Sequence, residues 1–370
     1  MPALVRAVWV ARFHYRNADD VRTIVRNCAA AGFNTVLWQV RGEATVAYPS
    51  RLEPWSREYD FQDPGFDPLA LAVEEAHRHG LRIEAWVNVL PAWKGKPPPP
   101  AWLTAHVWYA HPEWFLHDAH GGRQPAGDYY VVLNPCRADV RRHIAAVVDE
   151  MLTRYDLDGI HLDYVRYAWD GDKNAKRAYP RDADTVARFG RETGQTPDGD
   201  PAAWDHWRAN QLTRLVTEIR DVVARRRPGA TLTAAVWGDP RVGYRDYLQN
   251  SVAWLRSGLV DALMPMAYAD KAVDFVEKIN AHRQLAGHRR IVPGLGLYLH
   301  NTPQAMHDQM QLCRDWGGDF AAFSYDSLFP TAGDRQMKPE ARHTAQQLRH
   351  MRRGVLAAFV PPRPAVAAGP

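Results

Sequence analysis

Two aspartates stand where successive apolar segments of the chain end, and a glutamate follows a third segment. Asp163 closes the segment Asp158–Tyr164. Asp239 follows the segment Thr231–Trp237, and Glu43 comes after an earlier one. Hydrolysis of a glycosidic bond needs two carboxyl groups beside the scissile bond, one protonated and one ionised or nucleophilic. These three acids are therefore the candidate catalytic residues, with Asp163 as nucleophile or base and either Asp239 or Glu43 as acid.

The surroundings of the two aspartates predict different charges. A nearby cation can hold Asp163 ionised, and the candidates are Arg41, His161 and Arg166. Asp239 follows Trp237 closely, so we expect it to have a raised pKa and to act as acid. Gly-Asp-Pro around Asp239 is also a turn signal, which leaves a purely structural role open. Asp326, after the last apolar segment, is a further substitute acid.

Alternation along each strand sorts side chains into two faces. The inward-facing sets are predicted to be Gln39 and Arg41; Glu84, Trp86 and Asn88; Gly159, His161 and Asp163; and Thr233, Ala235 and Trp237. Polar groups inside a barrel are costly unless they are paired, so their concentration near one end predicts a functional site. Glu84 lies deeper, and we interpret it as part of a satisfied core network with His161 or Arg41.

Aromatic side chains give apolar faces to sugar C–H groups, and polar side chains fix their hydroxyls. The predicted substrate-binding residues are Arg41, Trp86, Asn88, His161, Tyr164, Arg166, Trp237, Tyr268, Tyr298 and Asp326. Further tryptophans fall in the same strand ends and loops, namely Trp93, Trp102, Trp108, Trp114 and Trp169. About half of the rim tryptophans are expected to be packing anchors, and Trp38, Trp204, Trp207 and Trp316 are assigned to the core.

Apolar segments of strand type alternate with segments of helical period along the whole chain. The expected strands are Val5–Ala11, Asn34–Val40, Arg82–Val89, Asp158–Tyr164, Thr231–Trp237, Asp261–Tyr268, Ile291–Leu297 and Phe320–Tyr325. The expected helices are Ala18–Ala31, Pro68–His79, Ala138–Tyr155, Ala203–Arg226, Tyr247–Ser257, Val273–Ala286, Pro303–Trp316 and Pro339–Met351. This order predicts an α/β fold, a (β/α)8 TIM barrel. The alternative, an open doubly wound sheet, would normally show a glycine-rich turn after its first strand.

Two strand-to-helix connections are long, Leu90–Arg137 and Val165–Ala202, and such loops build the functional rim of a barrel. Residues 1–355 are predicted to form this single barrel. Residues 356–370 are assigned to a Pro/Ala-rich C-terminal tail, which is richest from Pro361 to Pro370.

Composition narrows the function classes. No apolar run reaches the roughly 18 residues of a membrane span, so no stable membrane insertion is expected. The net charge is +4 with the charges interspersed, and Arg225 to Arg227 are interpreted as a solvated helix end, so no nucleic-acid partner is expected. Cys28, Cys136 and Cys313 are expected to be buried thiols. No metal or cofactor motif appears, so no cofactor is predicted, and the oligomeric state is not predicted. No signal peptide is visible, which taken alone predicts a cytoplasmic protein.

An ordered series of motifs resembles the bacterial glycosyl hydrolase-like 10 family from roughly Arg6 to Pro330. The matching segments are Arg6-Ala-Val-Trp9, Phe33-Asn-Thr-Val36, Gln39-Val-Arg41, Tyr48-Pro-Ser50, Leu52-Glu-Pro-Trp-Ser56, Phe66-Asp-Pro-Leu69, Glu75-Ala-His77, Ala85-Trp86 with Asn88, Asp156-Leu-Asp-Gly-Ile-His-Leu-Asp-Tyr-Val-Arg-Tyr167 and Met264-Pro-Met-Ala-Tyr268. Tyr164 stands where a common version of the motif has a second aspartate, and Glu43 where many relatives carry aspartate.

The resemblance implies a (β/α)8 barrel hydrolase of bacterial glycans, peptidoglycan-type glycan above all, with Asp163 central. It also favours export, periplasmic or extracellular, if a leader was removed. The function predicted is therefore cleavage of O-glycosidic bonds in an oligo- or polysaccharide. Two alternatives from other classes are a catalytically silent carbohydrate-binding barrel with one competent carboxylate, and a carbohydrate deacetylase or lyase.

Overall fold

The computed structural model of the chain describes residues 1–167 and 175–360. Eight parallel strands form a nearly closed barrel, in the spatial order β10-β11-β1-β2-β4-β7-β8-β9. Their bounds are β1 Arg6–Val10, β2 Thr35–Gly42, β4 Arg82–Asn88, β7 Gly159–Asp163, β8 Thr231–Trp237, β9 Ala262–Met266, β10 Gly294–Gly296 and β11 Phe320–Phe323. The predicted (β/α)8 barrel is confirmed, and the open doubly wound sheet is not the fold.

The barrel closes between β9 and β10 by a short contact rather than a full ladder. A single parallel bridge joins Leu263 to Ile291, where the Val292 amide donates to the Leu263 carbonyl at 2.9 Å. Pro265 and Pro293 have no amide hydrogen to donate, which explains why the strand predicted over 291–297 shrinks to β10. A Cβ at Gly294 would lie 2.4 Å from the Pro265 carbonyl oxygen, so glycine permits this close approach.

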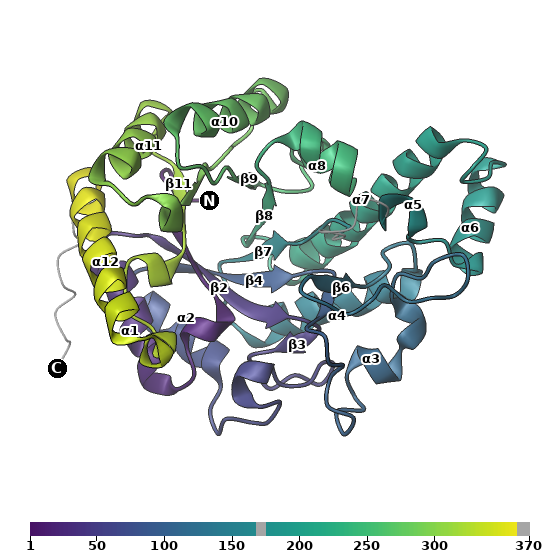
Figure 1. Cartoon of the computed structure of the whole chain (residues 1–370), viewed down its shortest axis with the longest axis horizontal. Helices are drawn as coiled ribbons and strands as arrows, with labels where there is room; N and C mark the ends of the chain where they lie inside the picture. The colour runs from purple at the N-terminus through teal and green to yellow at the C-terminus, as the bar shows by residue number, and fades with distance from the viewer. Residues whose placement is uncertain (168–174, 361–370) are drawn as a thin grey trace.

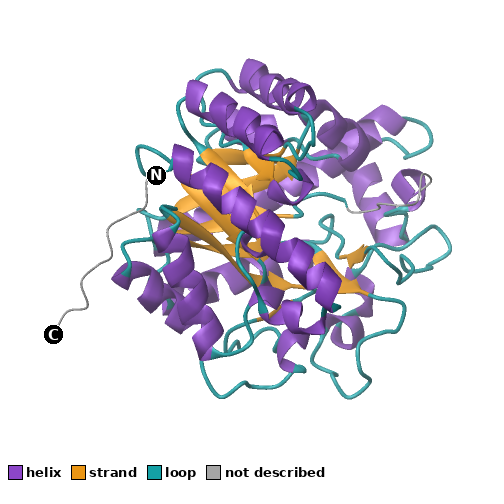
Figure 2. Ribbon diagram, turned by 60° about the vertical axis from the view of Figure 1, so that its left-hand side comes forward, coloured by secondary structure: helices purple, strands orange, loops and turns teal. Residues whose placement is uncertain are grey.

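Helices surround the strands, as Figures 1 and 2 show. Their bounds are α1 Ala18–Ala30, α2 Pro68–Arg78, α4 Ala138–Arg154, α7 Pro201–Arg226, α8 Pro240–Tyr247, α9 Ser251–Arg256, α10 Ala272–Ala286, α11 Pro303–Asp315 and α12 Pro339–Phe359. Most match the predicted segments closely. The helix predicted over 247–257 corresponds to the shorter α9, and the separate helix α8 just before it was not predicted. The missed signal was Asp239 followed by Pro240, a capping residue followed by proline at the first helical position.

The rim carries the small elements of the long loops. They are β5 Pro91–Lys94, α3 Val107–Ala110, β6 Tyr130–Val132, α5 Ala175–Ala178 and α6 Ala183–Thr193, and the short strand β3 Thr45–Val46 lies in the connection between β2 and α2. Single turns of 3-10 helix are η1 Arg12–His14, η2 Arg57–Tyr59, η3 Pro112–Trp114, η4 Leu297–Leu299, η5 Tyr325–Ser327 and η6 Ala332–Gln336. Strands β5 and β6 pair antiparallel, and α6 lies at one end of the molecule (Figure 1). The described parts of the two long loops therefore contain regular secondary structure.

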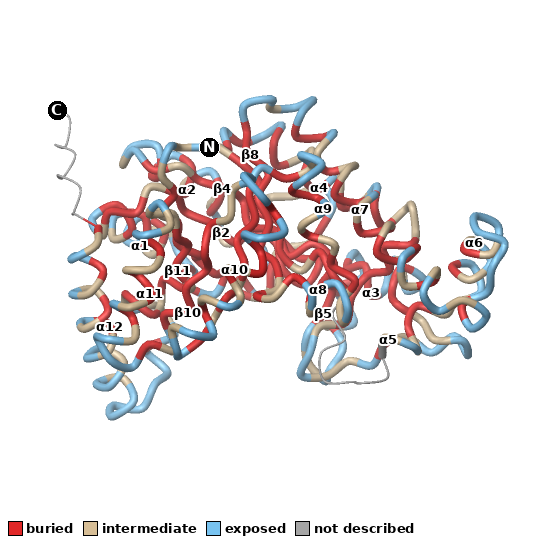
Figure 3. Tube along the Cα trace, turned by 90° about the horizontal axis from the view of Figure 1, so that it is seen from above, coloured by how far each residue is buried: buried red, intermediate tan, exposed pale blue. Residues whose placement is uncertain are grey.

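Buried residues form an inner and an outer core. The inner core fills the barrel and includes Trp9, Leu37, Trp86 and Ala235. The outer core lies between strands and helices, and Figure 3 shows the buried segments concentrated in the middle of the molecule. The predicted inward orientation of Trp86 and Ala235 is thus confirmed.

Other sequence predictions can be compared with the described residues. Cys28, Cys136 and Cys313 are buried free thiols, as expected. Helix α12 ends at Phe359, so residues 356–359, assigned to the tail, belong to this helix, whereas residues 361–370 lie outside the described residues. Within the described ranges, no helix is both long and apolar enough to cross a membrane.

Candidate functional site

A cavity of about 240 Å³ lies at the carboxyl ends of the strands, and we call it the mouth pocket. Its lining includes Trp9, Arg12, Trp86, Asn88, Tyr130, Asp163, Tyr164, Met266, Tyr268 and Phe323. Four of these residues were predicted to bind substrate, namely Trp86, Asn88, Tyr164 and Tyr268. Among the described residues that line the pocket, Asp163 is the only acid.

Asp163 is held firmly at the end of β7. The backbone amide of Tyr164 donates to Oδ1 at 2.6 Å, and the indole Nε1–H of Trp86 donates to Oδ2 at 3.2 Å. Only 5% of the residue is exposed. Burial raises the pKa of Asp163 above its usual value, although Arg166 and these two donors favour the carboxylate. The site therefore contains an acid that retains its proton to a higher pH than a surface aspartate.

The chain turns sharply after Asp163. Tyr164 has φ of 53°, a left-handed conformation that is uncommon for a residue with a side chain. This turn directs Arg166 back toward the site, where its Nη1 lies 3.7 Å from Asp163 Oδ1 and its guanidinium lies 4.0 Å from the centre of the Tyr164 ring. Of the three cations predicted to hold Asp163, Arg166 is the one that does so.

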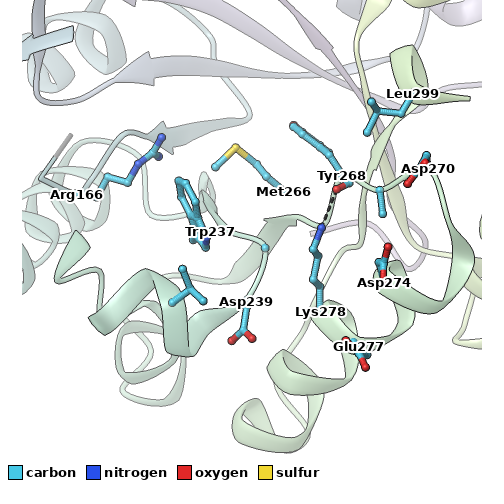
Figure 4. A pocket seen from close by; sticks show the side chains of 13 residues that line it. Arg166, Trp237, Asp239, Met266, Tyr268, Asp270, Asp274, Glu277, Lys278 and Leu299 are labelled. Atoms are coloured by element: carbon cyan, nitrogen blue, oxygen red, sulfur yellow. Dashed lines mark hydrogen bonds between the residues drawn. The ribbon is translucent and has the colours of Figure 1, made fainter. Parts of the chain in front are cut away.

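A larger cavity of about 700 Å³, the side pocket, shares Met266 and Tyr268 with the mouth pocket. Arg166 and Trp237 also line it (Figure 4). Lys278 Nζ donates to the Tyr268 carbonyl at 2.8 Å, which fixes the backbone between the two cavities. The predicted binding residues Arg166, Trp237 and Tyr268 thus form one continuous surface that runs outward from the mouth pocket.

Asp239 lines the side pocket and not the mouth pocket. Its side chain caps α8 by accepting from the Arg241 amide at 2.8 Å, and it pairs with the Arg241 guanidinium at 2.7 Å. These contacts lower the pKa of Asp239, the side-chain hydrogen bond from Arg241 most of all. Figure 4 shows its carboxylate directed away from Arg166 and Trp237. The prediction of a raised pKa at Asp239 is wrong, because a cap and an ion pair both favour the carboxylate.

Arg41 faces outward, and the prediction that it points into the barrel is wrong. The register shifts between residues 39 and 41, so that Arg41 pairs with Val87 rather than the next inward position. A bulge of this kind transfers all later side chains to the opposite face. Arg41 is fully buried, and its Nε and Nη2 donate to Glu53 at 2.8 and 2.6 Å. Arg41 and His143 hold the pKa of Glu53 at about 2, although burial alone would raise it.

Glu43 lies in the tight turn between β2 and β3, with φ of 61°. Its carboxylate lies 3.3 Å from Arg12 and 2.6 Å from Arg57. Burial raises the pKa of Glu43, and the two arginines oppose this shift. Glu43 is not among the residues that line the mouth pocket, but Arg12, which contacts it, is. A Cβ at Gly42 would lie 2.7 Å from Arg12 Nη1, so glycine makes room for this arginine.

Comparison with known families identifies the chain. A model of the family described as glycosyl hydrolase-like 10 matches residues 4–311, which is most of the chain. The chain belongs to the glycosyl hydrolase-like 10 family. Glycosyl hydrolase DigH of Escherichia coli K12 is 25% identical over 262 residues, which cover 64% of this chain and 55% of DigH. Glycosyl hydrolase YngK of Bacillus subtilis is 27% identical over 269 residues, covering 68% of this chain and 47% of YngK.

This member of the glycosyl hydrolase-like 10 family spans about half the length of the curated relatives it matches. Two solved structures share its fold. The glycoside hydrolase domain of PgaB (BpsB) from Bordetella bronchiseptica has a TM-score of 0.65 at 16% identity, covering 94% of this chain and 98% of that chain. Alpha-L-fucosidase isoenzyme 2 from Paenibacillus thiaminolyticus has a TM-score of 0.64 at 17% identity, covering 97% of this chain and 50% of that chain. At these identities the likeness establishes the barrel alone.

His161 is fully buried below the mouth pocket, and the prediction that it binds substrate is wrong. Its Nε2 accepts from the Trp9 indole at 2.9 Å, and its Nδ1 lies 2.8 Å from Thr233 Oγ1. Glu84 does belong to a buried core network, but the predicted pairing with His161 or Arg41 is wrong: Thr231 and Thr233 donate to its carboxylate at 2.7 and 2.6 Å.

Two predicted residues, Tyr298 and Asp326, line neither pocket. Tyr298, 48% exposed, places its ring 6.0 Å from that of Tyr268 at the rim. Asp326 lies 3.5 Å from His14 and accepts a hydrogen bond from Ser324. These two contacts hold the pKa of Asp326 at about 2, although burial would raise it. An acid with so low a pKa does not fit the substitute role predicted for it.

The rim tryptophans divide between packing and exposure. Trp93, Trp108 and Trp114 are buried anchors, whereas Trp102 is 60% exposed. Trp38, Trp204 and Trp207 are buried as predicted, and Trp316 is partly buried and stacks on Phe275. Trp169 lies outside the described residues.

The predicted site residues did not include several side chains of the mouth pocket, among them Trp9, Arg12 and Tyr130. Trp9 alternates inward along β1, so the rule applied to four other strands would have found it. Arg12 follows β1 directly, at the position where strand-to-helix loops carry site residues. Tyr130 comes from β6 in the long rim loop, and no local pattern places it there.

Proposed function

We propose that this chain is a glycosidase domain that cleaves O-glycosidic bonds of a bacterial polysaccharide, with peptidoglycan-type glycan favoured. One observation carries the proposal: Asp163 is a buried carboxyl group at the centre of an aromatic-walled pocket at the carboxyl end of a barrel. Catalytic residues of such barrels lie at this end. Membership of the family supports the same reaction class, and the names of DigH and YngK support it further.

In this proposal Asp163 acts as nucleophile or base. Burial raises the pKa of Asp163, which brings a base closer to the operating pH, while two N–H donors and Arg166 oppose this shift and favour the ionised form. Glu43 is the proposed acid, because burial raises its pKa and favours the protonated form that an acid needs. Arg12 contacts Glu43 and lines the pocket, so a shift of Arg12 would be the step that exposes Glu43 to substrate.

The test is release of reducing ends from a panel that contains peptidoglycan glycan strands without peptides, chitin oligosaccharides and a neutral glucan. We expect wild type to cleave the first, and both Asp163→Asn and Glu43→Gln to lower kcat by about 10²- to 10⁴-fold. Full activity of Asp163→Asn would refute the central role of Asp163. Full activity of Glu43→Gln alone would move the acid role to another residue.

A catalytically silent carbohydrate-binding barrel is the second candidate. The observation that favours it is that Asp163 is the only acid among the described lining residues of the mouth pocket. In that case wild type and Asp163→Asn would both bind oligosaccharide in calorimetry, and neither would release reducing ends from any member of the panel.

A further inference from the structure

A chain of four hydrogen-bonded side chains crosses the barrel beneath the mouth pocket. It starts at Trp9 on β1, passes through His161 on β7 and Thr233 on β8, and ends at Glu84 on β4. The three donor–acceptor distances are 2.9, 2.8 and 2.6 Å. All four residues are almost completely buried. Hydrogen bonds of this length in a dry interior have strict geometry, so the chain fixes the relative positions of four strands.

The four side chains can donate their hydrogen bonds in one direction only, from Trp9 toward Glu84. An indole nitrogen can only donate, so His161 Nε2 must accept from Trp9. A neutral imidazole then carries its hydrogen on Nδ1 and donates to Thr233 Oγ1. The Thr233 hydroxyl in turn donates to Glu84. Burial lowers the pKa of His161 to about 3, which agrees with a neutral ring in this place.

Trp9, the first of the four hydrogen-bonded side chains, reaches the mouth pocket. The Trp9 ring lines the mouth pocket, and it also packs against Phe323 of the pocket wall with ring centres 6.0 Å apart. His161 lies two residues before Asp163 on the same face of β7, and it is the register partner of Trp86, which donates to Asp163. The orientation of the pocket floor therefore depends on groups that never contact the pocket.

We propose that Glu84, Thr233 and His161 are positioning residues that hold the Trp9 indole as the floor of the mouth pocket and so determine its affinity for a sugar ring. The affinity part rests on the proposed function, whereas the positioning part does not. Loss of the Thr233 hydroxyl would leave the buried Nδ1–H of His161 without its acceptor, so the ring would turn toward another partner. The Nε2 atom would then no longer accept from Trp9, and the indole would lose its orientation.

Thr231 provides a matched control. It lies on the same strand and face as Thr233, is also buried, and also donates to Glu84, at 2.7 Å. It has no contact with His161 among the hydrogen bonds of the described residues. Thr231→Val therefore removes a hydrogen-bond donor to Glu84 but leaves the hydrogen bonds from Trp9 through His161 and Thr233 to Glu84 intact. Thr233→Val makes the same chemical change and breaks this series of hydrogen bonds.

The experiment combines 15N NMR with binding. In wild type we expect the His161 ring to show the Nδ1–H tautomer and the Trp9 Nε1–H to give one shifted indole resonance. Thr231→Val should keep both signals. Thr233→Val should shift the His161 ring signals and move the indole resonance, and should weaken binding of a chitin or peptidoglycan oligosaccharide about tenfold, the effect of one lost buried hydrogen bond.

Three outcomes overturn the proposal: an Nε2–H tautomer in wild type, unchanged signals in Thr233→Val, or equal weakening of binding in both valine variants. If Thr233→Val does not fold, the wild-type tautomer and Glu84→Gln decide, because glutamine can still accept from Thr233 and should preserve the Nδ1–H form. If no sugar binds to wild type, the NMR signals still test the positioning, and the proposed function fails separately.

Discussion

Asp163 ends strand β7 and Asp239 follows the neighbouring strand β8 by two residues, yet their surroundings give them opposite properties. Asp163 is buried among aromatic rings, and burial raises its pKa. Asp239 is partly exposed, caps a helix and pairs with Arg241, which lowers its pKa. The position of an acid at a strand end therefore does not make it catalytic. What separates the two is whether the next residues turn over the pocket, as after Asp163, or begin a helix, as after Asp239.

The largest expected effect is on activity. Asp163→Asn should lower kcat/KM by about 10²- to 10⁴-fold on whichever glycan wild type cleaves, whereas Asp239→Asn should leave it within about twofold. The same chemical change is made at two adjacent strand ends, so each variant is the control for the other. Equal losses in both variants would mean that Asp239 contributes to the reaction and that the side pocket belongs to the catalytic centre.

A third acid tests whether burial is the cause of the difference. Burial raises the pKa of Glu84 to about 7, although Thr233 and Thr231 oppose the shift. Between the usual pKa of 4.5 and 7, the unfolded chain has lost this proton and the folded protein retains it, so wild-type stability falls as pH rises through this window. The fall attributable to Glu84 should be about 3 kcal/mol.

Glu84→Gln has no proton to lose at this position, so its free energy of unfolding should not show the fall attributed to Glu84. Urea unfolding of wild type and Glu84→Gln from pH 4 to 8 gives the free energy of unfolding of each protein against pH, and the difference between the two curves measures the contribution of Glu84. His161 has the opposite effect: because its pKa is lowered to about 3, the folded protein becomes less stable as pH falls toward that value. This effect is the same in wild type and Glu84→Gln, so it cancels in the difference. Parallel curves would show that Glu84 titrates normally.

A smaller effect is expected on the cap at Asp239. Asp239→Ala should lower the free energy of unfolding by about 1 kcal/mol, because the first turn of α8 loses its side-chain acceptor. Asp239→Ser keeps an acceptor and should restore most of the loss. Asp163→Asn removes a carboxylate that burial disfavours but keeps one acceptor oxygen for two N–H donors, so these opposing effects should change stability at pH 7 by no more than about 1 kcal/mol. Denaturant titration of the three variants measures their free energies of unfolding. A larger loss in Asp163→Asn than in Asp239→Ala would contradict the conclusion that burial disfavours the Asp163 carboxylate.

The smallest effect concerns the ion pair itself. Arg241→Gln should raise the pKa of Asp239 toward its usual value and leave that of Asp163 unchanged. Carboxyl 13C NMR titration of the two residues reports both pKa values in one experiment. A shift at Asp163 as well would mean that the two carboxylates interact across the side pocket.

The sequence was sufficient for the barrel and for much of the mouth pocket. Strand alternation placed Trp86 and Asp163 correctly, because adjacent residues of a strand point to opposite faces whatever surrounds them. The alternation of eight strands with eight helical segments predicted the closed barrel, and this alternation also follows from local periodicity. Trp9 and α8 were within reach of these rules, as the alternation along β1 and the Asp239-Pro240 cap show in retrospect.

Only the tertiary structure decided which polar groups meet. The shift in register before Arg41 reversed its side, and Tyr130 reaches the pocket from a distant rim loop. The direction of the pKa shift at Asp239 depended on Arg241 and the helix cap, and the partners of Glu84 came from a strand almost 150 positions away. Local periodicity determines which way a side chain points, whereas burial, charge pairing and hydrogen bonding depend on contacts between distant segments that no local pattern encodes.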